Sequence, residues 1–183
     1  MLNELLEKSK INKKVIGVRL YDDTGFLCGI VIDYNDDIVQ LQNYTEYGQL
    51  DGVGLEEISQ IERIDFNDEY TNSIEYLIKN QDKLLEPEFK SRFFEDLLED
   101  DWQNLAITPY VNEKNFLICI QINQDIIYRG FIEQINEAHF TFKCIGNLGE
   151  DKGISMFKFE DVSSLKINDL ECRKRFLLYQ WNH

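Results

Sequence analysis

The sequence predicts an α+β protein, mainly β, in which two small five-stranded β-barrels follow each other, with helices flanking and connecting them. Three observations lead to this prediction. The chain has 183 residues, which suits one ordinary domain or two small ones. Short apolar segments alternate with turns at hairpin spacing, and the pattern recurs 101 residues later. A hydrophobic content of 43% is enough for a core.

The repeat is visible when residues 29–69 are aligned with residues 130–170 without a gap. The apolar positions then agree along the segment, and six positions are identical: Gly29/Gly130, Asn35/Asn136, Gly48/Gly149, Gly52/Gly153, Asn67/Asn168 and Asp68/Asp169. The copies differ by one residue only upstream of the first glycine, in a turn, where insertions are tolerated. We therefore predict an internal duplication.

Within the first copy, the pattern predicts strands over residues 15–20, 26–34, 38–44, 53–58 and 60–66, with a polar loop over 45–52. The β-branched residues at 30–32 suit a central strand. Hairpin connections between five strands in about 55 residues favour a small barrel over a sandwich.

Helices are expected around both copies. Leu2, Leu5 and Leu6 form a short leading stripe, and Asn67-Asp68 caps a helix that follows the first copy. Pro87 starts an amphipathic helix that extends toward residue 105, and Asn168-Asp169 precedes a C-terminal one. Apolar stripes of this kind are more typical of core than of partner sites. The predicted organisation is a first repeat over residues 1–80, a helical connector over 81–110 and a second repeat over 111–183.

Charge argues against nucleic acid and anionic membranes as partners, because the chain has 19 Lys plus Arg, 34 Asp plus Glu and a formal net charge of −15. The excess of acidic over basic side chains is distributed unevenly along the chain. Residues 65–101 hold 12 acidic and 4 basic side chains, whereas residues 102–183 hold 10 and 9. The connector contains the densest acidic run, made of Glu95, Asp96, Glu99, Asp100 and Asp101. This run is either a solvated helix face or a docking surface for a basic partner protein.

Four cysteines stand far apart, with no Cys-x-x-Cys pair and no neighbouring histidine, so we expect reduced, mostly buried thiols and no zinc site. The first residues lack the basic start and apolar run of a secretory signal. No apolar stretch approaches the roughly 20 residues that a membrane-spanning helix needs. A cytoplasmic location without a membrane partner is therefore expected.

The segment from Phe26 to Leu41 combines an apolar strand, Gly29, further apolar residues, a polar turn at Asn35-Asp36-Asp37 and a second apolar strand. This arrangement resembles the first sequence motif of Sm-like (LSm) proteins, most clearly over residues 15–66 and more weakly over 116–167. The resemblance implies a strongly bent, five-stranded SH3-like barrel in each repeat.

The chain also departs from the Sm-like pattern where that family contacts RNA. Val39 and Phe140 stand in place of the base-contacting Asn, and the basic residue–glycine pair of the second motif is missing. Residues 62–65 and 163–166 occupy that region instead. The fold is expected to carry over, and RNA binding is not.

No motif selects a metal, a cofactor or a catalytic centre. Residues 33–37 begin like a calcium loop, but Ile38 replaces the required glycine and Tyr44 the required glutamate, so we predict a β-turn. Of the two histidines, His139 is expected to be half-buried in a strand and His183 is the last residue. Carboxylates could still pair in space, although nothing in the sequence selects a pair. We predict a protein that is not an enzyme.

The loops over residues 43–52 and 144–153 are the best binding candidates, since loops on a rigid scaffold often carry function. In the first loop the candidate contacts are Tyr44, Glu46, Tyr47 and Asp51, with a simple packed turn as the alternative. The predicted function is an intracellular protein-interaction module, in one version an acidic, immunity-type inhibitor of a basic toxin. The alternative is a nucleic-acid or small-ligand module that uses Lys143, Lys152, Lys158 and Lys166 in the second copy.

Overall fold

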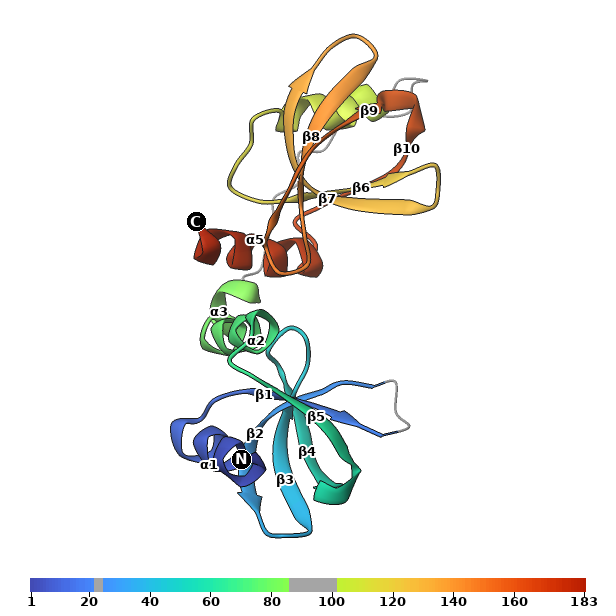
Figure 1. The fold of residues 1–183 in the computed structure, drawn as a ribbon. Helices are drawn as coiled ribbons and strands as arrows, with labels where there is room; N and C mark the ends of the chain where they lie inside the picture. The colour runs from blue at the N-terminus through green and yellow to red at the C-terminus, as the bar shows by residue number, and fades with distance from the viewer. Residues whose placement is uncertain (22–24, 86–101) are drawn as a thin grey trace. The chain divides into compact units, whose positions relative to one another are not determined.

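The structure, a computed structural model, describes residues 1–21, 25–85 and 102–183 (Figure 1). The chain divides into two compact units, Met1–Gln81 and Asp82–His183, each of which contains one five-stranded antiparallel sheet. We describe them separately as unit 1 and unit 2. The described part of the chain is mainly β with additional helices, as the sequence predicts, and no helix in it is long and apolar enough to cross a membrane.

Unit 1 begins with helix α1 (Leu2–Asn12) and ends with α2 (Glu69–Lys79) and the start of the short α3 (Gln81–Leu84). Its strands are β1 (Ile16–Leu20), β2 (Leu27–Tyr34), β3 (Ile38–Tyr44), β4 (Leu50–Glu57) and β5 (Ile61–Phe66). The 3₁₀ turn η1 (Ile58–Gln60) joins the last two. The sheet order is β4-β3-β2-β1-β5, so β4 and β5 are its edges.

The core of unit 1 lies between α1 and the inner face of the sheet, as Figure 1 shows for the helix and β2. It contains Leu6 from α1 and five fully buried aliphatic residues from the strands: Ile16, Val18, Val31, Val39 and Leu41. The buried Ser9 ties the helix to the sheet, because its hydroxyl donates to the Lys14 carbonyl at 2.6 Å and accepts from the Val31 N–H at 3.0 Å.

Asp68 caps α2, as the sequence predicts. Its carboxylate accepts from the Thr71 N–H at 2.8 Å, and the Thr71 hydroxyl accepts from the Asp68 N–H at 3.1 Å, which completes a capping box. Ile74 and Leu77 are the buried apolar residues of this helix.

Unit 2 contains α4 (Trp102–Ile107), the 3₁₀ turn η2 (Thr108–Tyr110) and the C-terminal α5 (Leu170–Asn182). Its strands are β6 (Ile118–Ile122), β7 (Ile126–Ile135), β8 (His139–Ile145), β9 (Asp151–Lys158) and β10 (Val162–Ile167). A third 3₁₀ turn, η3 (Phe159–Asp161), links the last two. The sheet order β10-β6-β7-β8-β9 is the same as in unit 1.

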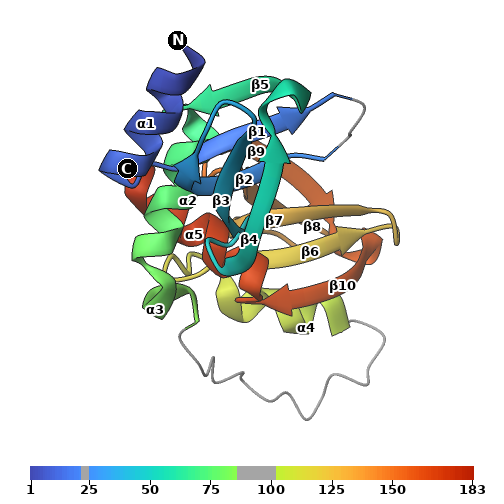
Figure 2. The same cartoon turned by 90° about the horizontal axis from the view of Figure 1, so that it is seen from below.

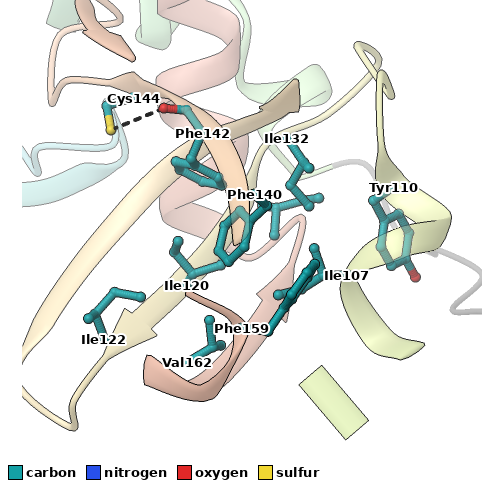
Figure 3. Packing of buried hydrophobic residues seen from close by; sticks show 11 residues of the cluster. Ile107, Tyr110, Ile120, Ile122, Ile132, Phe140, Phe142, Cys144, Phe159 and Val162 are labelled. Atoms are coloured by element: carbon teal, nitrogen blue, oxygen red, sulfur yellow. Dashed lines mark hydrogen bonds between the residues drawn. The ribbon is translucent and has the colours of Figure 1, made fainter. Parts of the chain in front are cut away.

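The core of unit 2 is aromatic where that of unit 1 is aliphatic. Figure 3 shows the ring of Phe140 of β8 between Phe142, which it meets edge to face, and Phe159, and Ile107 of α4 belongs to the same cluster. Tyr110 belongs to the same cluster, and Gln103 donates to the Val162 carbonyl at 3.4 Å, which places α4 beside β10 (Figure 2). The end of the predicted connector therefore packs onto unit 2, while residues 86–101 lie outside the described part.

A second, smaller cluster lies on the opposite face of this sheet, where α5 covers it. Its buried members are Leu117, Cys119, Phe131, Ile145 and Cys172. Asp169 caps α5 by accepting from the Cys172 N–H at 2.7 Å, as the sequence predicts.

The prediction of two five-stranded barrels is confirmed only in part, because the described residues form two five-stranded sheets that are open. β4 pairs only with β3 and β5 only with β1 among the described residues, and β9 and β10 are edges in the same way. Closure would need a hydrogen-bonded ladder between the two edge strands. The three-residue η1 and η3 turns instead carry the chain from one edge to the other without forming a hairpin.

The two sheets also share their irregularities. The register shifts between Val31 and Asp33 in β2, and 101 residues later between Ile132 and Gln134 in β7. A β-bulge of this kind bends a strand and increases its twist. The described parts of units 1 and 2 are therefore similar in order, register and bends.

Candidate interaction surface

The turn between β3 and β4, Thr45–Gln49, is held firmly in place. The Thr45 hydroxyl accepts from the N–H groups of Tyr47 and Gln49 at 3.3 and 3.2 Å. The Tyr47 carbonyl accepts from the side-chain amide of Gln81 at 2.6 Å. Gly48, at φ +70°, packs against the backbone of α2. The first predicted binding loop therefore contains a turn that packs against α2, although part of the loop is exposed to solvent.

The structure places the four predicted contacts of this loop in different environments. Tyr44 ends β3 and Tyr47 lies in the turn, both half-buried, whereas Glu46 and Asp51 are exposed. Asp51 belongs to β4, which begins at Leu50 rather than after the predicted loop 45–52. Burial raises the pKa of Tyr70 to about 12, and the nearby charges of Cys28, Glu46 and Asp68 add to the effect. The other five predicted contacts, Glu95, Asp96, Glu99, Asp100 and Asp101, lie outside the described residues.

The feature that the sequence did not reveal is an apolar surface on the edge strand β4. Leu50, Val53 and Leu55 are 70%, 55% and 66% exposed. We call these three residues the β4 surface. Ile38, at the start of the neighbouring strand, is also exposed. The alternation of Val53 and Leu55 identifies a strand, but only the sheet order shows that this strand has a single neighbour.

A bulge brings Leu50 onto the same face as the other two residues. Tyr44 pairs with Leu50 and Gln42 with Val53, so one residue of β3 faces two of β4 between these pairs. Gly52 lies in the bulge at φ +80°, a conformation that L-residues with side chains adopt only with strain. The side-chain amide of Gln42 donates to the Gly52 carbonyl at 2.7 Å and fixes the bulge.

The corresponding edge of unit 2 differs in charge. Ile154 and Met156 of β9 are 68% and 67% exposed, and Gly153 has a φ of +83°. β4 carries Asp51, Glu56 and Glu57 and no basic residue, whereas β9 carries Asp151, Lys152 and Lys158. The two edge strands thus share apolar residues at matching positions and differ in charge.

The lysines that a nucleic-acid site in unit 2 would use are engaged with acidic groups. Lys143 lies 3.0 Å from Asp151, Lys152 lies 3.0 Å from Glu150, and Lys158 lies 3.0 Å from Glu160. Lys166 is exposed on β10. Three of the four predicted bases therefore face a carboxylate.

The polar turn at residues 35–38 is a β-turn, as predicted. The Asn35 side-chain carbonyl accepts from the N–H groups of Asp37 and Ile38, both at 2.8 Å, and Asn136 does the same for Ala138 and His139 in unit 2. His139 is half-buried at the start of β8, also as predicted. Within the described ranges, no group of three or more His, Cys, Asp or Glu side chains is arranged to hold a metal ion.

All four cysteines are free and buried, which confirms the sequence prediction. Comparison of the chain with family models, with curated proteins and with solved structures finds no match. The case for a function therefore depends on the residues themselves.

Proposed function

We propose that this chain is a non-enzymatic, intracellular protein-interaction module that binds its partner through the β4 surface. The observation that carries the proposal is the exposure of Leu50, Val53 and Leu55 on an edge strand. An edge strand presents unpaired backbone N–H and C=O groups, and natural proteins usually protect such edges with charges or cover them. Contiguous exposed apolar side chains are typical of interaction sites.

The chemistry of the strand indicates the kind of partner. An extended segment that adds to β4 would gain main-chain hydrogen bonds and bury alternate side chains. The same strand carries Asp51, Glu56 and Glu57 and no basic residue, so this edge of the sheet is negatively charged. A segment of alternating apolar and Lys or Arg residues matches both properties. An acidic inhibitor of a basic protein is one specific form of this function.

The intracellular location is supported by the four free, buried cysteines, since reduced thiols are typical of the cytosol. We also infer that units 1 and 2 are a duplicated pair. Support comes from their common sheet order, the bulges 101 residues apart and the matching positive φ angles of Gly52 and Gly153. Nucleic-acid binding is not part of the proposal, because the chain has 34 acidic against 19 basic side chains and a formal net charge of −15.

Selection of displayed random peptides on the immobilised protein tests the proposal. We expect the wild type to enrich peptides in which apolar and basic residues alternate, and Leu55→Glu to abolish their binding. Because Leu55 is mostly exposed, this substitution should change the free energy of unfolding by less than about 0.5 kcal/mol. Met156→Glu places the same charge on the other edge strand and is the matched control, which should bind as the wild type does.

Two outcomes would contradict the proposal. One is peptide binding that survives Leu55→Glu, which would place the site elsewhere. The other is self-association: if sedimentation shows a wild-type dimer and a Leu55→Glu monomer, the strand pairs with a second copy of this chain and not with a different partner.

A further inference from the structure

Unit 2 contains a pocket of about 410 Å³, to which α5 contributes Arg175. This volume lies within the range of about 300–1,000 Å³ that is usual for small-ligand sites. The start of β7, the end of β8, the turn that follows, β9 and α5 all contribute to its walls. We call it the β7–α5 pocket. It is distinct from the β4 surface, which belongs to unit 1.

Three basic side chains line this pocket, and they are Arg129, Lys152 and Arg175. Glu150 is the single acidic residue among the lining residues. Its carboxylate is already engaged, since one oxygen lies 3.0 Å from Lys152 and the other accepts from the Leu148 N–H at 2.9 Å. The lining therefore has more positive than negative charge.

Arg129 has an unused donor. Its Nε is buried and has no hydrogen-bond partner, while one of its terminal nitrogens, Nη2, lies 3.4 Å from the Asp169 carboxylate. A buried N–H without an acceptor costs free energy comparable to a lost hydrogen bond. Arg129 also lines the pocket with a side chain that is 16% exposed, so an anionic group there would meet its positive charge.

Arg175 is held in a fixed position at the same pocket. Its Nε donates to Glu171 at 2.8 Å and its Nη1 donates to the Ile145 carbonyl at 3.0 Å. The remaining walls include Ile127, Tyr128 and Ile145. The pocket thus combines an apolar wall with ordered positive charge, the combination that a ligand with an apolar body and an anionic group requires.

Unit 1 shows that the fold does not need these bases. The residues 101 positions before Arg129, Lys152 and Arg175 are Cys28, Asp51 and Ile74. The sheet of unit 1 nevertheless has the same strand order. Stability of the sheet alone therefore does not account for three bases around one pocket.

We propose that the β7–α5 pocket binds a small organic anion with an aromatic or branched apolar body and a carboxylate or phosphate group. Arg129 contacts the anionic group, Lys152 contacts it with a second N–H of its ammonium group while it stays paired with Glu150, and the walls at Ile127 and Ile145 contact the apolar body. Arg175, which already donates to Glu171 and to the Ile145 carbonyl, contributes positive charge to the lining.

Calorimetric titration of the full chain with benzoate, phenyl phosphate and inorganic phosphate tests this assignment. We expect benzoate or phenyl phosphate to bind, with an affinity that falls as salt is added. Arg129→Gln should weaken binding about tenfold or more, because a hydrogen bond to a charged group contributes roughly 1.5–3 kcal/mol. Lys152→Gln should weaken it less, about threefold to tenfold. Lys158→Gln removes the same charge outside the pocket and should leave the affinity unchanged.

Binding of benzoate alone would identify a carboxylate ligand, and binding of phenyl phosphate alone a phosphate ligand. The proposal is overturned if neither compound binds at up to about 10 mM, a concentration at which a millimolar Kd would be detected. It is equally overturned if inorganic phosphate binds as tightly as phenyl phosphate, or if Lys152→Gln behaves like Lys158→Gln. Lys152 is more than half exposed, so its variant remains decisive if Arg129→Gln does not fold.

Discussion

Gly48 lies directly against the backbone of Leu77. A Cβ added at Gly48 would stand 2.9 Å from the Leu77 carbonyl carbon and 2.7 Å from the Ile78 nitrogen, closer than side-chain carbons approach such atoms. The turn after β3 can therefore rest on α2 only if position 48 has no side chain. Unit 2 repeats the relationship, with Gly149 against Leu178 and Tyr179 of α5.

The first prediction compares alanine substitutions at Gly48 and Gly52. The comparison separates the cost of a steric conflict from the cost of backbone strain. Gly52 has a φ of +80°, similar to the +70° of Gly48, but a Cβ added there would meet nothing within 4 Å. Gly52→Ala should therefore cost about 1–2 kcal/mol of unfolding free energy, from strain alone. Gly48→Ala should cost at least about 1 kcal/mol more, because overpacking adds to the strain. Denaturant unfolding of both variants measures the difference, and equal losses would show that the turn does not rest on α2.

The second prediction concerns the link between α1 and β2. Ser9→Ala should lower the free energy of unfolding by about 1–3 kcal/mol, because the buried Val31 N–H loses its acceptor. Ser59→Ala, at an exposed position, serves as the control and should change it by less than about 0.5 kcal/mol. If the two serine variants proved equally stable, Ser9 would not anchor the helix.

The third prediction is a loss of stability in acid that depends on Asp169. Burial by itself would raise the pKa of this carboxyl, but the hydrogen bonds from Cys172 and the charge of Arg129 lower it below the ordinary value of 3.8. A folded-state pKa below the unfolded value stabilises the protein above the unfolded pKa, and this stabilisation is lost as the pH falls through the folded pKa.

Asp169→Asn keeps an acceptor for the Cys172 N–H but cannot titrate. The variant should be less stable than the wild type at neutral pH, and its stability should fall less steeply between about pH 5 and pH 2. Denaturant unfolding at a series of pH values measures both slopes. Identical slopes would mean that Asp169 titrates alike in the folded and unfolded chain.

The fourth prediction is that the native thiols are unreactive. Burial, assisted by the charges of Asp68 and Glu75, raises the pKa of Cys28 to about 12, and burial likewise raises the pKa of Cys172. Because the thiolate is the nucleophile, a thiol-specific reagent at mildly alkaline pH should modify the folded protein far more slowly than the unfolded one. Unfolded protein, in which all four thiols should react, is the control. A rapid native phase would show that at least one cysteine is accessible.

Much of the fold could be predicted from the sequence because its signals are local. Alternating apolar residues identify strands, and Asp68 and Asp169 identify the starts of α2 and α5 through the N–H groups that they cap. Two of the three glycine pairs of the repeat, Gly48/Gly149 and Gly52/Gly153, mark places where the chain adopts a positive φ angle. The open edges were missed, because whether β4 meets β5 depends on the path of the chain through η1 and on the bends of the whole sheet.

The candidate sites were harder to predict because both depend on contacts between distant segments. Glu46 and Asp51 of the predicted loop are exposed, but the apolar pattern of Leu50, Val53 and Leu55 is that of an ordinary strand, and only the sheet order places these residues at an edge. The β7–α5 pocket brings Arg129 and Arg175 together from elements 46 positions apart in the sequence. The predicted loop 144–153 does form one wall of this pocket, but the sequence did not indicate that basic side chains would gather around the pocket.

The β4 surface is the central claim, and quantitative affinity purification with three versions of the chain tests it most directly. Wild type, Leu55→Glu and Met156→Glu should be compared in the cells that make the protein. The account predicts a basic partner protein that is retained by wild type and Met156→Glu and lost with Leu55→Glu. A partner retained equally by all three, or no specific partner for the wild type, would contradict it.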